Sequence, residues 1–189
     1  MKIALPFKIM FGFYAVMGVA FGLAASGVEI PMVLPYKWHK LLHITGAIMF
    51  LGNVVVTGLW SGLASRMQRP AFVRFAIRGV VWADVWFTGP GFLLAVVNGV
   101  VMLPPWGGLY GANWLIATLV LFGISGVLAS VVMPLQVKLW RLCEGELDDP
   151  LPEALEPTVK VWAVWGSLAV LPLLGILAMM VLKPEFGGG

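Results

Sequence analysis

Two histidines one helical turn apart are the side chains in this sequence best suited to hold a metal ion or a cofactor. They are His39 and His43, and they open a long apolar segment that begins near Trp38. On an α-helix, residues at positions i and i+4 lie on the same face. An imidazole nitrogen is a common ligand of haem iron, copper and zinc. The pair therefore marks a candidate ligand site at the start of this helix.

The histidine pair allows three interpretations. In the first, the imidazoles lie at a membrane interface and bond to water, to Glu29 or to Asn98. In the second, His43 or His39 binds the iron of haem b. Because both histidines share one helix face, they cannot bind opposite sides of one haem. The second axial ligand would then be Met102 or a residue of a second protomer, or that position would stay open. In the third, His39 and His43 bind a copper or zinc ion, and Glu29, Met32 or Met102 completes its coordination.

A second set of polar residues lies deeper in the apolar segments. Asn53 and Thr57 continue the histidine-bearing face at helical spacing, whereas Asp84, Thr88 and Asn98 share one face of the next apolar segment. An apolar helix with one polar stripe is expected to turn that stripe towards protein and away from lipid. These residues are the candidate intramembrane polar site.

Asp84 is the ionisable member of that site. A carboxylate at the centre of a membrane helix costs about 2.5–3.5 kcal/mol on insertion scales, so it usually has a partner in the bundle. One interpretation is a proton-relay or gating group. The other interpretation is a structural group that reaches Arg74, Arg78 or water. It is favoured because Asp84 lies only about two helical turns from the preceding basic loop.

The composition is that of a membrane protein. Of the 189 residues, 60% are hydrophobic and 11% are charged, with a mean hydropathy of +0.96. Ordinary soluble domains carry about 25% charged residues, so lipid must form most of the surroundings. No basic run is interleaved with exposed aromatics, so no nucleic-acid partner is expected. The single Cys143 excludes an intrachain disulfide and is read as an ordinary reduced thiol.

The hydropathy pattern predicts an all-α bundle with five spanning helices in one transmembrane domain, residues 1–189. The first helix could also be a secretory signal, but its length favours an uncleaved span. Pro90 predicts a kink in the third helix, and Gly123 with Gly126 predicts a close helix contact in the fourth. The predicted helices cover about residues 6–28, 38–65, 75–103, 113–140 and 158–182, with an acidic, proline-rich cytoplasmic loop at about 144–157.

The basic residues predict the orientation of the bundle. They gather at the N-terminus and beside the second and fourth connections, whereas the third connection has no Lys or Arg. The positive-inside rule then predicts the N-terminus inside and the C-terminus outside, in a bacterial plasma membrane. Because the second and third helices are joined by a short connection, they should pack antiparallel. This places His39 and His43 level with Asn98 and Met102. It also places Asn53 and Thr57 level with Asp84.

Four groups of residues form short motifs in the sequence. They are Lys40-Leu41-Leu42-His43 with Gly46, Phe50, Gly52 and Asn53; Asp84 with Thr88-Gly89-Pro90-Gly91; Asn113-Trp114-Leu115; and Pro134-Leu135-Gln136. Together these motifs resemble a family of small bacterial integral membrane proteins of unknown function. The resemblance runs from about Trp38 to Arg141 and implies no activity. The helix over residues 38–65 is also weakly similar to copper-resistance-D-type proteins and to the haem-binding protoporphyrinogen oxidase of bacteria, which implies a ligand at His43.

The sequence contains no nucleophile elbow, phosphate loop, dinucleotide fingerprint or HExxH motif, so no enzyme class is assigned. The first functional hypothesis is a non-catalytic accessory or structural subunit that packs with other membrane subunits, or with copies of itself, in the lipid bilayer. The second is a redox or metal-handling membrane protein that uses His43. The third is a small transporter that uses Asp84.

Overall fold

The computed structural model describes residues 4–67, 69–146 and 148–186, and these contain helices and no strand. The five expected spans are all present, because five stretches are long and apolar enough to cross a membrane. The third of them, Pro70–Val101, combines three consecutive elements. The elements are α1 (Leu5–Ala25), α2 (Tyr36–Met67), α3 (Pro70–Ala83), η1 (Asp84–Thr88), α4 (Gly89–Val101), η2 (Pro104–Trp106), α5 (Asn113–Leu142) and α6 (Leu155–Leu182).

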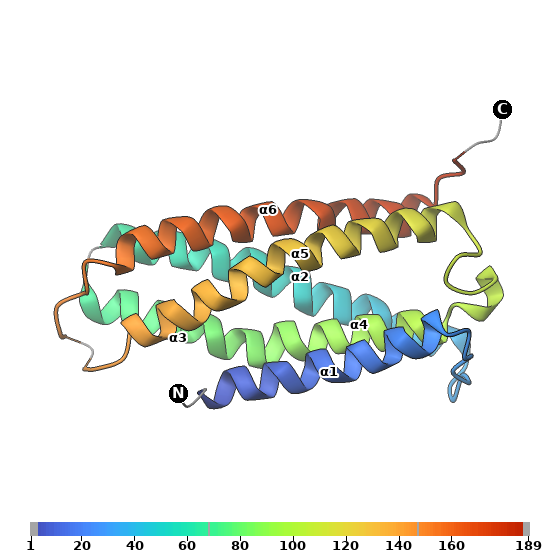
Figure 1. Ribbon diagram of the computed structural model, residues 1–189, viewed down its shortest axis with the longest axis horizontal. Helices are drawn as coiled ribbons and strands as arrows, with labels where there is room; N and C mark the ends of the chain where they lie inside the picture. The colour runs from blue at the N-terminus through green and yellow to red at the C-terminus, as the bar shows by residue number, and fades with distance from the viewer. Residues whose placement is uncertain (1–3, 68, 147, 187–189) are drawn as a thin grey trace.

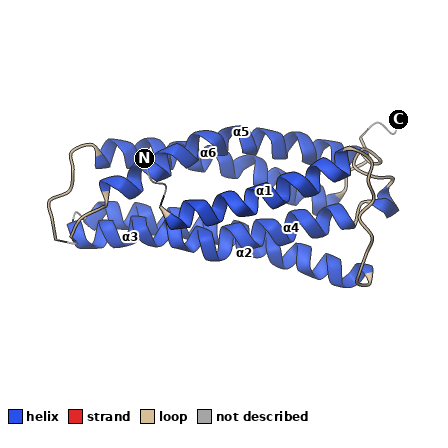
Figure 2. Ribbon diagram, turned by 60° about the horizontal axis from the view of Figure 1, so that its bottom comes forward, coloured by secondary structure: helices blue, strands red, loops and turns tan. Residues whose placement is uncertain are grey.

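The helices run side by side in an elongated bundle, with the two termini towards opposite ends (Figure 1). α2 packs mainly against α4, α1 also packs against α4, and α5 packs mainly against α6. Figure 2 shows this arrangement, with the loops confined to the two ends. We call the end with the α2–α3 and α5–α6 connections the basic end, after Arg66, Arg69 and Arg141. The other end is called the histidine end, because His39 lies there at the start of α2.

Two helices begin earlier than the hydropathy pattern predicts. α3 begins at Pro70 rather than near residue 75, and α6 begins at Leu155 rather than near residue 158. Pro70 is tolerated at the start because the first helical residues need no N–H donor. Pro157 lies in the first turn of α6 for the same reason. In both cases a proline that suggested a loop lies in the first turn of a helix.

The third span changes its winding at its centre. Residues Asp84–Thr88 form a π-helix, and Pro90 follows in the first turn of α4. Proline has no N–H group, so the carbonyl four residues earlier, at Trp86, loses its usual helical partner. π-Turns inside membrane and soluble helices occur frequently at functional sites. The irregularity expected at Pro90 is therefore a widened turn, and it contains Asp84 and Thr88.

α2 and α4 cross in close contact at a pair of glycines. A Cβ atom on Gly46 would meet the carbonyl oxygen of Gly91 and would lie 2.6 Å from the backbone nitrogen of Ala95. A Cβ on Gly91 would lie 2.8 Å from the carbonyl oxygen of Gly46 and from the backbone nitrogen of Phe50. Small residues at such crossings let membrane helices approach closely. This crossing holds the polar faces of α2 and α4 together.

The close contact expected at Gly123 and Gly126 is not made within the protein. Both glycines are exposed, and a Cβ on either would have no neighbour within 4 Å. Ser125, between them, is buried and donates a hydrogen bond to the carbonyl of Ala169 in α6 at 3.1 Å. The α5–α6 contact is therefore made on the serine face of the helix.

The basic end has its own apolar core. Val73, Ile77, Leu139, Cys143 and Leu155 form a buried cluster that joins α3, α5 and α6. Cys143 lies just past the end of α5 and is fully buried. Burial raises the pKa of its thiol to about 11, against a smaller lowering by two nearby arginines. The thiol is therefore protonated at neutral pH, in agreement with an ordinary reduced cysteine.

Candidate functional site

A hydrogen-bonded cluster around Asp84 joins three spans at the middle of the bundle. Oδ1 of Asp84 accepts hydrogen bonds from Thr88 Oγ1 at 2.7 Å and from Asn53 Nδ2 at 3.0 Å. Oδ2 accepts from Gln136 Nε2 at 2.6 Å. Asn53 Nδ2 also donates to Thr88 Oγ1 at 2.8 Å. The carboxyl group, in a residue only 8% exposed, is thus held by α2, by its own π-turn and by α5.

Neither Arg74 nor Arg78 bonds to Asp84 in the structure, so the part of the favoured interpretation in which these arginines reach Asp84 is wrong. Arg74 is buried and its guanidinium donates to the carbonyl oxygens of Glu144 at 2.8 Å and Pro150 at 3.1 Å. Arg78 lies over the ring of Trp140, 5.8 Å from its centroid. Arg74 therefore bonds to the α5–α6 connection, and Arg78 packs on the last turn of α5.

Gln136 is the member of the cluster that the polar-stripe analysis missed. It is buried on α5, two residues after Pro134. A single amide in an otherwise apolar span was the available signal, because such a group usually faces the interior of a bundle. Thr57 was expected beside Asp84 but instead donates to the carbonyl oxygen of Asn53 within α2, at 2.7 Å. Thr57 therefore supports the cluster only through the backbone.

His39 is buried and both of its ring nitrogens have partners. The backbone N–H of Leu34 donates to Nε2 at 3.4 Å, so Nε2 is the unprotonated nitrogen. Nδ1 then carries the proton and donates to Asn98 Oδ1 at 2.8 Å. Asn98 is fixed in turn, because its Nδ2 donates to the carbonyl oxygen of Leu94 at 2.8 Å. His39 therefore locks α2 to α4 and could bind a metal only by breaking a contact.

His43 has a different environment. Its Nδ1 is 2.6 Å from the carbonyl oxygen of Ala95, which can only accept, so Nδ1 must carry the proton. Its ring lies over Gly99, where a Cβ would come within 3.2 Å of the imidazole. An imidazole with Nδ1–H held by a carbonyl presents the lone pair of Nε2, which is the arrangement found in many metal sites. Of the two histidines, only His43 keeps a ring nitrogen with no hydrogen-bond partner among the described residues.

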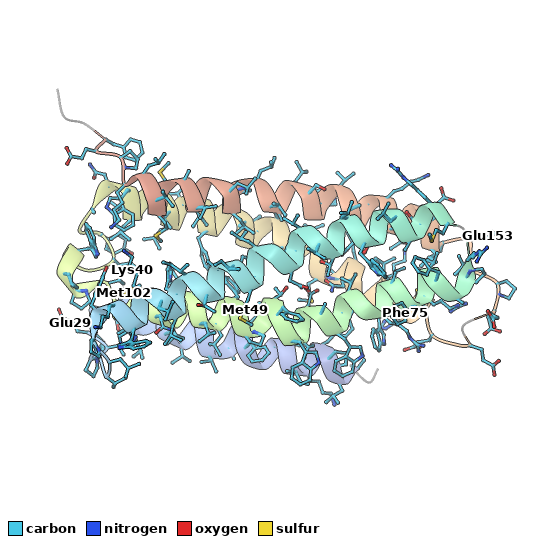
Figure 3. The ribbon with its side chains drawn as sticks, turned by 180° about the vertical axis from the view of Figure 1, so that it is seen from behind. Glu29, Lys40, Met49, Phe75, Met102 and Glu153 are labelled. Atoms are coloured by element: carbon cyan, nitrogen blue, oxygen red, sulfur yellow. The ribbon has the colours of Figure 1, made fainter. Side chains whose placement is uncertain are left out.

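The other residues proposed as ligands gather only loosely near the histidines. Figure 3 shows Glu29 and Met102 at the histidine end of the bundle, with Lys40 nearby. Met102 is buried, whereas Glu29 is exposed and lines an open recess of about 400 Å³. In the part of the chain that the structure describes, no three His, Cys, Asp or Glu side chains come close enough to hold a metal ion. The proposed ion site of His39, His43 and Glu29 is therefore not assembled.

The fold and these polar contacts define a class: a multi-pass helical membrane protein with hydrogen-bonded polar clusters between its spans. Residues 37–184 match the family described as "Predicted integral membrane protein (DUF2269)", and the chain belongs to this family. The family expected from the motifs of residues 38–141 is thus confirmed. No curated protein and no solved structure matches the chain.

Proposed function

We propose that this protein is a non-catalytic accessory subunit that packs against another transmembrane helix in a larger assembly of a bacterial plasma membrane. The observation that carries this proposal is the uncovered face of α2. Only 6% of its most apolar window is buried within the chain. Along this face, Gly58 and Gly62 are exposed, and a Cβ on either would have no neighbour within 4 Å.

Gly58 and Gly62 have the spacing at which membrane helices dimerise. Two glycines four residues apart lie one above the other on a helix and let a second backbone approach closely. Lipid can cover this face, but lipid packs poorly into the groove that the two glycines leave. A helix with small residues of its own would fit it better.

The internal use of the polar side chains supports a structural role. Asp84, Asn53 and Gln136 are bonded to one another, and His39 is bonded to Asn98. Hydrogen bonds between spans fix their register and orientation. Polar groups that are already satisfied by neighbours hold the subunit in one shape, as a docking partner requires. The expected orientation, with the basic end inside, follows from the arginines at that end.

The test compares two double variants, each extracted from the native membrane into lipid nanodiscs. Gly58→Leu with Gly62→Leu should abolish co-purification of a partner, or of a second copy, in lipid nanodiscs examined by native mass analysis. Gly123→Leu with Gly126→Leu on the equally open face of α5 is the matched control and should leave the assembly intact. A wild-type protein that is always a solitary monomer in native lipid would contradict the proposal.

A second candidate function, haem binding, is favoured by the geometry of His43. Its Nδ1–H is fixed by the carbonyl oxygen of Ala95, and its Nε2 has no partner among the described residues. In His39, by contrast, both ring nitrogens have partners. A proximal haem ligand needs this arrangement, because the carbonyl sets the tautomer and orients the ring. Since no opposing histidine exists in the chain, a haem would bind at an interface with a partner or keep an open position.

This candidate predicts a spectrum that depends on one histidine. Protein purified from haem-replete cells is expected to show a Soret band that is lost in His43→Ala. The band should persist in His39→Gln, because glutamine can retain the contact with Asn98 and His39 is not the ligand. A colourless preparation, or a band that is lost equally in both variants, would rule out His43 as the specific ligand.

A further inference from the structure

A small cavity lies beside the Asp84 cluster on the side of the basic end. Its volume is about 20 Å³, and its polar lining comes from Ser61 and Ser65 of α2, Gln136 of α5 and Trp162 of α6. The rest of the lining is apolar, and half of it comes from α3. A cavity needs roughly 10–15 Å³ of this kind of volume to hold one water molecule. The space is therefore large enough for a water and too small for an organic ligand.

One of the lining side chains has an unsatisfied donor. The indole Nε1 of Trp162 is buried and has no hydrogen-bond partner among the described residues, a state it shares only with Nε of Arg74. Trp Nε1 is a donor and cannot accept. Buried polar atoms in native proteins nearly always have a partner, and an unpaired one indicates a bound water or ion. A donor N–H repels a cation, so the expected occupant is water.

Acceptors for that water line the same cavity. Gln136 uses its Nε2 to donate to Asp84, and no described side chain or backbone N–H donates to its Oε1. The hydroxyl of Ser61 donates to the carbonyl oxygen of Thr57 at 2.8 Å and keeps its lone pairs for another donor. A water that accepts from Trp162 and donates to Gln136 and Ser61 would make three hydrogen bonds. Three is the usual number for a buried water.

We propose that this cavity is a specific water site that connects α6 to the Asp84 cluster. The water orients the amide of Gln136: by donating to Oε1, it keeps Nε2 turned towards the carboxyl group of Asp84. Ser65, which also lines the cavity, is exposed, so the site can exchange with water at the basic end. The Asp84 carboxyl is then one hydrogen-bonded amide away from water that enters from the basic end.

The site is tested on the full chain in lipid nanodiscs, with nitrogen-15 in the tryptophan indoles. The Trp162 indole N–H signal is assigned by its loss in Trp162→Phe. In the unmodified protein, this signal is expected to show a cross-peak to bound water and to exchange with deuterium. A Trp162 indole signal with neither a water cross-peak nor exchange would overturn the proposal without any need for a variant.

A cavity-filling variant provides the second arm. Ala64 is buried and lines the cavity, so Ala64→Val should expel the water, remove the cross-peak and slow deuterium exchange at Trp162 at least tenfold. Ala129→Val, on the exposed face of α5, is the matched control and should leave the signal unchanged. A water cross-peak that survives in folded Ala64→Val would show that the water lies outside this cavity and would contradict the assignment.

Discussion

Gly46→Ala, which adds a single methyl group, is expected to be among the most destabilising substitutions in this protein. The new Cβ would meet backbone atoms of α4: the carbonyl oxygen of Gly91 and, at 2.6 Å, the nitrogen of Ala95. A flexible side chain could move aside, but a helix backbone cannot move without separating the helices. Overpacking in a tight core costs about 1–3 kcal/mol, and a backbone clash should lie at the upper end.

The matched control is Gly52→Ala in the same helix. Gly52 is exposed, and a Cβ there would have no neighbour within 4 Å. The same chemical change should therefore be neutral or slightly stabilising, because alanine favours the helix by about 1 kcal/mol over glycine. Thermal unfolding in one detergent, followed by helix content, compares the two variants. Equal melting temperatures for both would show that α2 and α4 do not cross at Gly46.

The same crossing supports the histidines. His39 bonds to Asn98 and His43 to Ala95, so both contacts bridge α2 and α4 on the face that the glycines bring together. A wider spacing of the helices at Gly46 would lengthen both hydrogen bonds at once. If His43 has a ligand role, it therefore depends on Gly46 and Gly91, which bear no polar side chain.

The sequence predicted the α2–α4 layer well because few variables determine it. A short connection makes the second and third spans antiparallel, and a fixed helical rise then sets which residues share a depth. This reasoning placed His39 level with Asn98 and Asn53 level with Asp84, and the structure joins both pairs by hydrogen bonds. The π-turn altered the winding but left Asp84 and Thr88 on the face towards α2.

The contribution of α5 could not be derived in the same way. α5 is far in sequence from α2, and its rotation depends on how its whole surface packs against α6 and α3. Gly123 and Gly126 predicted the contact face of α5, but glycines occur on lipid-exposed and buried faces alike. The buried polar residues of α5 are instead Thr118, Ser125 and Gln136. The choice of the glycine face therefore left Gln136 out of the Asp84 cluster.

Asp84→Leu is expected to lower stability by about 2 kcal/mol or more, whereas Asp84→Asn should change it by less than about 1 kcal/mol. Pairing with Asn53 alone would make the loss small, because hydrogen bonds between membrane helices average about 0.6 kcal/mol. Leucine, however, leaves the amide of Gln136 and the hydroxyl of Thr88 without their acceptor, and Asn53 keeps only Thr88. Each buried, unsatisfied donor costs about 1–3 kcal/mol, which outweighs the gain from removing a carboxylate.

Asparagine avoids this cost because it keeps one oxygen for Asn53 and Thr88. Its new NH₂ group would face Nε2 of Gln136, and rotation of the Gln136 amide would replace that repulsion with a hydrogen bond to Oε1. A double-mutant cycle with Gln136→Leu isolates this contact. Gln136→Leu should destabilise the wild type but have little effect in the Asp84→Leu background, where the amide has already lost its acceptor. Equal losses in both backgrounds, measured by unfolding in detergent at unchanged helix content, would show that Gln136 and Asp84 are not coupled and that α5 is held to the bundle by its apolar contacts.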